Sequence, residues 1–179
     1  FLKKYINYTF TKSDSFLCQG LTFQKFAIDQ LNFKKSEAPI IPNWTAKKEH
    51  LKLGANRNYY NQNYPKILFL GWLEEFKGVK EILEASKILK NDNYNFQLSL
   101  AGDGKCKIYV QNYIKKNNLE DFVLLKGWVN NNQKLKLLKD SNIFILPTWN
   151  EGFPNALVEA MSSGLACIVS NVGMIPDFT

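Results

Sequence analysis

From residue 66 onward, short apolar runs alternate with longer segments whose apolar residues recur at helical spacing. Runs of four to six apolar residues bounded by Gly or Pro are typical of buried strands. Five runs are therefore predicted to be strands: Ile67–Leu70, Phe96–Ala101, Phe122–Leu125, Ile143–Leu146 and Ala166–Val169. Four of them are closely followed by a Gly or Pro: Gly71, Gly102, Gly127 and Pro147.

The segments between these runs have the spacing of amphipathic helices. Apolar faces are formed by Val79, Ile82, Leu83, Ser86 and Leu89, by Val110, Tyr113 and Ile114, and by Leu135, Leu138 and the alkyl stem of Lys139. Alternation of this length predicts βαβ units and an α/β fold: a Rossmann-like parallel sheet with helices on both faces. Ligands of such sheets bind beyond the carboxyl ends of the strands.

Residues 1–43 follow a second, shorter pattern. Phe1–Thr11 and Leu21–Leu31 fit helices, Ser15–Cys18 and Ala38–Ile41 fit strands, and Pro42-Asn43-Trp44 then turns the chain. The polar stretch 56–65, rich in Asn and Tyr, is predicted to be a linker.

The amino-acid composition limits the classes of protein to which this chain can belong. The chain has 179 residues and is 45% hydrophobic, enough for one sizeable core or one domain and part of another. No apolar run approaches the ~18 residues of a membrane-spanning helix. The dispersed Cys18, Cys106 and Cys167 are predicted to be reduced core thiols. The single histidine, His50, is predicted to lie at the surface, and no metal site is expected.

The positive charge is uneven along the chain. Residues 1–65 carry ten Lys/Arg against four Asp/Glu, which gives +6 of the total +7. A basic half is compatible with a nucleic acid, an anionic membrane surface or an acidic acceptor, and equally with a plain solvated surface. The scarcity of arginine, with Arg57 as the only one, argues against a nucleic-acid partner.

The most informative motif lies near the end of the chain. It reads Glu151-Gly-Phe-Pro-Asn-Ala-Leu-Val-Glu159-Ala-Met-Ser-Ser-Gly164, with two carboxylates eight residues apart around a Gly, a Pro and the start of a helix. This phrase resembles the E-x7-E signature of retaining, nucleotide-sugar-dependent glycosyltransferases with the two-domain GT-B architecture, known as group 1 or family 4.

The resemblance extends over nearly the whole chain and implies its domain organisation. Residues 1–43 would be the tail end of the N-terminal, acceptor-binding domain with its last βαβ element, and 44–65 the linker. Residues 66–179 would be a C-terminally incomplete donor-binding domain. Ile40-Ile41-Pro42-Asn43 matches the strand and turn at the domain junction. A fragment without most of the acceptor domain is expected to be inactive alone.

The family's site residues can be transferred to the E-x7-E segment. Asn155 is predicted to cap the following helix, whose free N–H groups offer an anion site. The resemblance implies that Glu151 is catalytic and lies at the donor hexose, and that Glu159 accepts hydrogen bonds from the ribose. Gly152, Phe153, Pro154, Asn155 and Ala156 complete this donor-binding segment.

Three further loops match the family less specifically. Gly71 followed by Lys77-Gly78 resembles the G-R-x4-K-G phosphate motif, but Trp72 stands where the family usually has Arg. Gly102-Asp-Gly104 resembles the G-x-G turn, and the backbone of Gly127-Trp128-Val129 would contact the base, with Trp128 stacking on it. Asp177 stands where Glu is usual.

The resemblance also implies the partners. The donor would be a nucleoside-diphosphate sugar of the UDP or GDP type, bound without a metal or other cofactor. The acceptor would be a glycan or a lipid-linked glycan in surface polysaccharide or lipopolysaccharide synthesis. A cytoplasmic protein is expected, and contact of its basic N-terminal half with the inner face of the membrane is left open.

Two alternatives to the transferase interpretation remain, and the sequence argues against a third. A nucleotide-sugar epimerase or a phosphorylase shares the architecture, and fold does not separate them. A dinucleotide-dependent oxidoreductase would need Gly-x-Gly-x-x-Gly after the first strand, but the chain reads Gly71-Trp-Leu-Glu there. A non-catalytic nucleotide-binding module would be compatible with Trp72.

Overall fold

The computed structural model describes residues 8–10, 12–43, 45–57 and 63–179. These residues form two compact units, a larger one of 45–150 and 155–170 and a smaller one of 1–44, 151–154 and 171–179. The helices are α2 (Leu21–Leu31), α3 (Lys48–Ala55), α4 (Val79–Asn91), α5 (Lys107–Lys116), α6 (Asn131–Asp140) and α7 (Asn155–Ser162). The strands are β1 (Lys66–Leu70), β2 (Gln97–Ala101), β3 (Val123–Gly127), β4 (Ile143–Leu146) and β5 (Ala166–Val169). Three 3-10 turns are η1 (Lys35–Glu37), η2 (Glu75–Lys77) and η3 (Ile175–Asp177).

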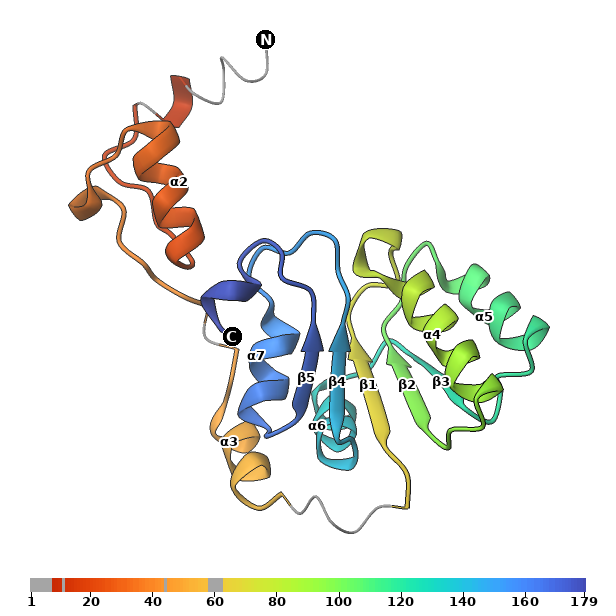
Figure 1. Cartoon of the computed structure of the whole chain (residues 1–179). Coiled ribbons are helices and arrows are strands. Elements are labelled where there is room, and N and C mark those ends of the chain that lie inside the picture. The colour runs from red at the N-terminus through yellow and green to blue at the C-terminus, as the bar shows by residue number, and fades with distance from the viewer. Residues whose placement is uncertain (1–7, 11, 44, 58–62) are drawn as a thin grey trace. The chain divides into compact units, whose positions relative to one another are not determined.

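The larger unit is built on a five-stranded sheet of order β3-β2-β1-β4-β5 (Figure 1). Every neighbouring pair is parallel. Helices α4 and α5 pack together over one face, and α6, which contacts β1, lies on the other (Figure 1). Helix α7 contacts β4 and β5, and α3 contacts α6 and α7. The predicted Rossmann-like α/β fold is thus confirmed.

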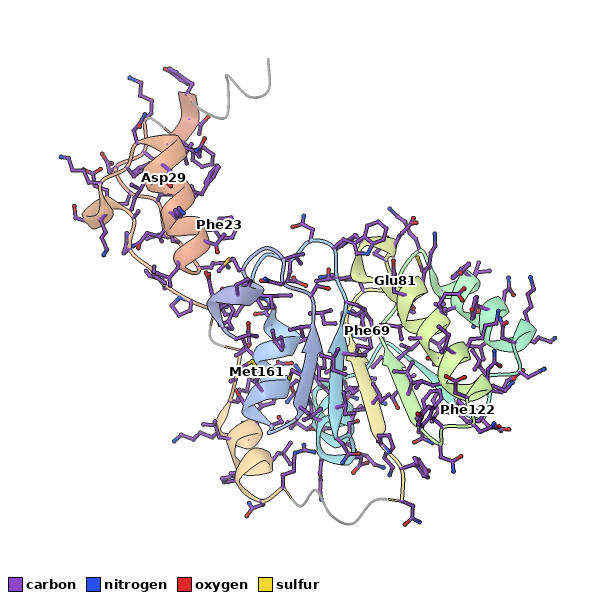
Figure 2. The ribbon with its side chains drawn as sticks, viewed as in Figure 1. Phe23, Asp29, Phe69, Glu81, Phe122 and Met161 are labelled. Atoms are coloured by element: carbon purple, nitrogen blue, oxygen red, sulfur yellow. The ribbon has the colours of Figure 1, made fainter. Side chains whose placement is uncertain are left out.

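The core of this unit lies where the helices cover the central strands. Leu68 and Phe69 on β1 are fully buried, as are Leu100 on β2 and Phe144 on β4. Figure 2 shows Phe69 within the sheet. Since consecutive residues of a strand point to opposite faces, burial of both Leu68 and Phe69 requires cover on both sides. This is why the strands read as continuous apolar runs in the sequence.

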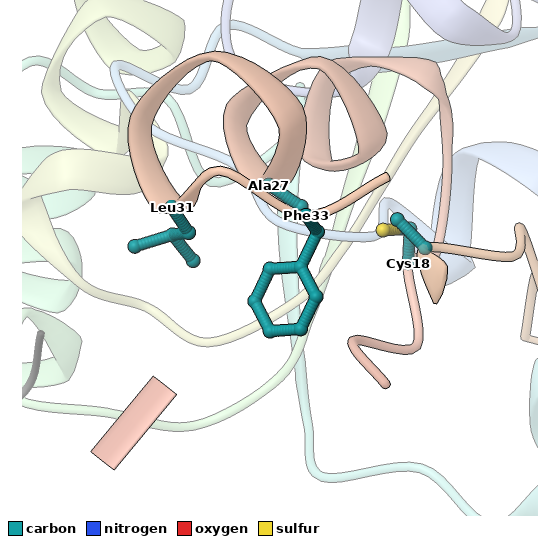
Figure 3. Packing of buried hydrophobic residues seen from close by; sticks show 5 residues of the cluster. Cys18, Ala27, Leu31 and Phe33 are labelled. Atoms are coloured by element: carbon teal, nitrogen blue, oxygen red, sulfur yellow. The ribbon is translucent and has the colours of Figure 1, made fainter. Parts of the chain in front are cut away.

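The smaller unit has its own small core around α2. Its buried residues are Cys18, Ala27, Leu31, Phe33 and Ala38, with Phe10, Phe16 and Phe23 packed against them (Figure 3). Helix α2 has the predicted bounds. Residues 8–10 of the predicted N-terminal helix are helical, and 1–7 and 11 lie outside the described residues.

The two strands predicted beside α2 are reduced to one parallel bridge between Cys18 and Ile40. The Cys18 N–H donates to the carbonyl of Pro39 (3.0 Å), and the Ile41 N–H donates to that of Cys18 (2.7 Å). Pro39 and Pro42 lack an N–H, so this segment cannot extend a regular ladder. The topology of a βαβ element is present, but its strands are not.

Helix α3 falls within the segment predicted as a linker, and it belongs to the larger unit. The expected surface position of His50 on this helix is wrong, because the residue is only 1% exposed. Its Nδ1 accepts a hydrogen bond from the Lys47 N–H (2.9 Å), which caps the helix. Near the end of the segment, Arg57 donates to the carbonyls of Ser163 (2.8 Å), Leu138 (2.6 Å) and Ser141.

The division into acceptor-domain tail, linker and donor domain stays a prediction. Within the described residues, no helix has the length and apolar character needed to cross a membrane.

Candidate functional site

The loops that follow β1, β2 and β3 are joined to each other by backbone hydrogen bonds. The Gly71 N–H donates to the carbonyl of Ala101 (3.1 Å), and the Gly102 N–H donates to that of Gly127 (2.8 Å). A Cβ on Gly102 would lie 1.8 Å from the Gly71 oxygen, and one on Gly104 would lie 2.6 Å from the Leu73 oxygen. Both glycines also have φ values, +154° and +155°, that favour glycine. Close packing of the protein backbone therefore accounts for Gly102 and Gly104 before any ligand is considered.

The loop that carries Lys77 is tied to the loop after β4. The carbonyl of Phe76 accepts hydrogen bonds from the Trp149 N–H (2.8 Å) and the Thr148 hydroxyl (3.0 Å). Gly78 has a φ of +73°, and a Cβ there would clash with the carbonyl of Pro147. The Lys77 ammonium lies 5.3 Å from the centre of the Phe76 ring. These contacts hold Lys77 at the carboxyl edge of β1 and β4.

Trp72 and Trp128 pack against each other at the same edge. Their ring centres are 5.3 Å apart with planes inclined by 44°. The two residues are 54% and 68% exposed, so neither belongs to the core. Trp72, which stands where the family described above usually has Arg, is therefore one member of an exposed tryptophan pair. The pair joins the loop after β1 to the loop after β3.

Glu159 lies in the second turn of α7 and is largely buried. Its Oε1 is 2.5 Å from the ammonium of Lys134, which lies in the first turns of α6. The side chains of Lys134 and Glu159 are 25% and 11% exposed. Because α6 and α7 follow β3 and β4, both helices begin at the carboxyl edge of the sheet, and their free N–H groups and positive dipole ends favour an anion there.

Helix α7 begins at Asn155, which agrees with the predicted start of the helix, and the role of Asn155 as its cap stays a prediction.

Glu151 belongs to the smaller unit with Gly152, Phe153 and Pro154. Its carbonyl accepts a hydrogen bond from the Met174 N–H (3.3 Å). A Cβ on Gly173, where φ is +56°, would lie 1.9 Å from the same oxygen. Phe153 and Phe178 form an edge-to-face pair with ring centres 4.9 Å apart. The segment that follows β5 thus fixes the backbone that carries Glu151.

Asp177 caps the start of α2 within the same unit. Its Oδ2 accepts from the Thr22 N–H (3.0 Å) and its Oδ1 from the Thr22 hydroxyl (2.8 Å). A carboxylate at this position satisfies a free N–H and favours the helix dipole. Asp177, which stands where the family usually has Glu, therefore stabilises the start of α2.

The pKa values of two ionisable groups near these loops differ from their usual values. The bond to the Lys107 ammonium (2.9 Å), followed by the Gly104 N–H, lowers the pKa of Asp103 from its usual value. Burial raises the pKa of the Cys106 thiol. Among the residues that the structure describes, no group of three His, Cys, Asp or Glu side chains could hold a metal ion.

Comparison with known proteins identifies the family. The model of "Glycosyl transferases group 1" matches residues 55–179, which include every loop described above at the carboxyl edge. The chain belongs to the group 1 glycosyltransferases. The family membership that the E-x7-E motif predicted is confirmed.

Individual relatives of this glycosyltransferase chain agree. The amylovoran biosynthesis glycosyltransferase AmsK of Erwinia amylovora is 33% identical over 118 residues, 63% of this chain and 29% of AmsK. The UDP-Gal:alpha-D-GlcNAc-diphosphoundecaprenol alpha-1,3-galactosyltransferase of Escherichia coli is 35% identical over 123 residues, 67% of this chain and 30% of that protein. The matches thus span less than a third of these relatives' length.

The fold is shared with solved glycosyltransferases. The pneumococcal O-GlcNAc transferase GtfA, in a complex with UDP and GlcNAc, superposes with a TM-score of 0.75 at 19% identity. The alignment covers 96% of this chain and 34% of GtfA.

The structure brings together some of the predicted site residues of this glycosyltransferase chain. Gly71, Lys77, Gly102, Gly104, Trp128, Val129, Ala156 and Glu159 lie in or beside the loops and helix starts at the carboxyl edge of the larger unit. Glu151 belongs to the other unit. Lys134, the partner of Glu159, was missed because no motif marks it within the polar helix 131–140. The assignment of donor-binding roles stays a prediction.

Proposed function

We propose that this chain is the donor-binding part of a retaining glycosyltransferase. The enzyme transfers a hexose from a nucleoside-diphosphate sugar to a glycan or lipid-linked acceptor in surface polysaccharide synthesis. The observation that carries the proposal is Glu159, a largely buried carboxylate held in the second turn of α7 within a chain of the group 1 family. A carboxylate accepts several hydrogen bonds at once, which suits a ribose diol.

The names of the relatives support the substrate class. The E. coli relative is named for UDP-Gal as donor and a diphosphoundecaprenol-linked sugar as acceptor. The solved GtfA complex contains UDP. A UDP-type donor and a lipid-linked or polysaccharide acceptor are therefore our proposal for this chain. The diphosphate would be met by Lys77, the N-terminus of α7 and the loop at Gly71, without a metal.

Glu151 is proposed as the catalytic carboxylate. Retaining transfer builds positive charge on the anomeric carbon as the diphosphate leaves. A carboxylate that orients the hexose hydroxyls and stabilises this charge contributes most in the transition state. In the full-length protein, Glu151→Gln should abolish transfer while leaving nucleoside-diphosphate affinity nearly unchanged, as judged by product formation and calorimetry.

Donor binding is tested directly on this chain. Titration calorimetry with UDP, GDP and ADP, with and without EDTA, should find one nucleotide that binds equally well in both buffers. Glu159→Ala should weaken that binding by roughly 1.5–3 kcal/mol, the range for a hydrogen bond to a charged group. Loss of binding on chelation would contradict the metal-free proposal.

A non-catalytic nucleotide-binding module is the second candidate, favoured by Trp72 at the usual arginine position. Normal transfer by Glu151→Gln, or nucleotide binding by a wild-type protein that never transfers sugar, would support it.

A further inference from the structure

The ion pair between Lys134 and Glu159 is unlike the other ion pairs described in this protein. The pairs Lys34–Glu37, Lys80–Glu75 and Lys107–Asp103 have side chains that are 38% to 81% exposed. The Lys134–Glu159 pair is mostly buried, and it joins α6 and α7, the helices that follow the loops after β3 and β4. Burial of two charges carries a desolvation cost, so such a pair is not explained by surface solubility.

The pair keeps unused hydrogen-bonding capacity. An ammonium has three N–H donors and a carboxylate has about four acceptor sites. Within the described part of the chain, the one hydrogen bond recorded for either side chain is the bond between them, at 2.5 Å. Lys134 and Glu159 therefore present free donors and free acceptors next to each other, and a quarter of the Lys134 side-chain surface is exposed.

A hydroxyl group matches this arrangement because it donates one hydrogen bond and accepts others. Two vicinal hydroxyls, as in a ribose, match it best: their hydrogens reach Glu159 while a lone pair receives an N–H of Lys134. We propose that Lys134 is a ribose-binding residue of the donor site, which acts with Glu159 to select ribonucleotides over 2′-deoxyribonucleotides. This inference rests on the proposed function as a nucleotide-sugar transferase.

Charge balance is a second argument that Lys134 takes part in binding the donor. A lone carboxylate beside the ribose would repel the diphosphate of the same nucleotide, and the repulsion is strong where water is excluded. Lys134 makes the ribose site neutral overall, so the anionic donor can approach it. This compensation matters in a chain whose phosphate loop carries Trp72 where the family usually has Arg.

The test compares Lys134→Met with Lys136→Met, a control on the exposed side of the same helix. Each variant and the wild type are titrated with the nucleoside diphosphate that binds the wild type best and with its 2′-deoxy form. We expect the wild type to prefer the ribonucleotide by about tenfold, the effect of one hydrogen bond to a charged group. Lys134→Met should lose that preference, and Lys136→Met should keep it.

Removal of Lys134 alone leaves Glu159 buried without its cation, so the melting temperature is measured first. Should Lys134→Met be unstable, the pair Lys134→Met/Glu159→Gln removes both charges and should fold, and it should bind the two nucleotides equally. An unchanged preference in the folded variant overturns the inference and leaves the proposed function standing. A wild type that binds no ribonucleoside diphosphate overturns both.

Discussion

The two units of this chain differ in how completely they bury their apolar residues. The larger unit covers both faces of a five-stranded sheet and leaves Leu68, Phe69 and Phe144 without exposure. The smaller unit buries a cluster of five residues around α2 together with Met174 and Ile175, while Leu17, Leu21 and Ile41 remain at least half exposed. Since burial of apolar area is the main source of stability, the larger unit should fold by itself and the smaller one should open more readily.

Core truncation should show the largest difference between the units. Phe144→Ala in the larger unit should lower the free energy of unfolding by about 3–5 kcal/mol, through lost burial and a cavity left in the core beside β4. Phe33→Ala in the smaller unit should leave the main transition nearly unchanged, because the two cores share no residue. Urea unfolding followed by circular dichroism measures both. A comparable loss in the two variants would mean that the units fold as one.

Glycine substitution should come next in size. Gly102→Ala places a Cβ 1.8 Å from a carbonyl in the larger unit and should cost about 1–3 kcal/mol, the range for a strained backbone conformation. Gly152→Ala in the smaller unit meets no atom within 4 Å and should be tolerated. Thermal unfolding of the two variants gives the comparison, and equal melting temperatures would show that the loops after β1 and β2 are not packed as described.

Each unit also contains a charged side chain whose hydrogen bonds to the backbone at helix ends can be removed by substitution. Arg57→Met removes hydrogen bonds to three carbonyls near the ends of α6 and α7 and should cost roughly 1.5–3 kcal/mol. Asp177→Ala removes the cap of α2 and should cost about 1 kcal/mol. The Arg57 effect should appear in the main urea transition and the Asp177 effect before it. The reverse order would contradict the assignment of these residues to different units.

Thiol labelling gives the finest comparison. Burial raises the pKa of Cys167 to about 11, so little thiolate is present at pH 8, and its alkylation should accelerate as the pH rises toward that value. Cys18 is more buried, and burial raises its pKa also, but it belongs to the smaller unit. In increasing urea at pH 8, iodoacetamide should label Cys18 at lower concentrations than Cys167. Labelling of Cys18 and Cys167 at the same urea concentration would contradict the proposed difference in stability between the two units.

The sequence predicted the parts of this molecule that depend on local pattern. All five strands, α2 and the helices between the strands were predictable, because a parallel strand covered on both faces is a continuous apolar run. Helix α3 was not, since it has few apolar residues and its stability comes from contact with α6 and α7. The surface position predicted for His50 was wrong for the same reason, because this residue lies on α3.

The candidate site also has a part that the sequence predicted and a part that it did not. The Glu151 and Glu159 positions follow from one contiguous motif, and family membership confirms what that motif indicated. The Lys134–Glu159 ion pair and the Trp72–Trp128 pair join residues far apart in the sequence. Such contacts depend on how helices and loops are placed by the sheet, and no spacing rule contains that information.

The three carbonyl contacts of Arg57 have a consequence for chemical modification. Arg57 is the sole guanidinium in the 179 residues, and it is engaged with backbone oxygens inside the larger unit. Any positively charged side chain that this chain offers to an anion is therefore a lysine. Acylating reagents directed at amines should abolish anion recognition by these residues, whereas a dicarbonyl reagent such as phenylglyoxal could do so only after the fold has opened. Ammonium groups are compact and strongly hydrated, so the recognition they provide should also weaken steeply as salt is added.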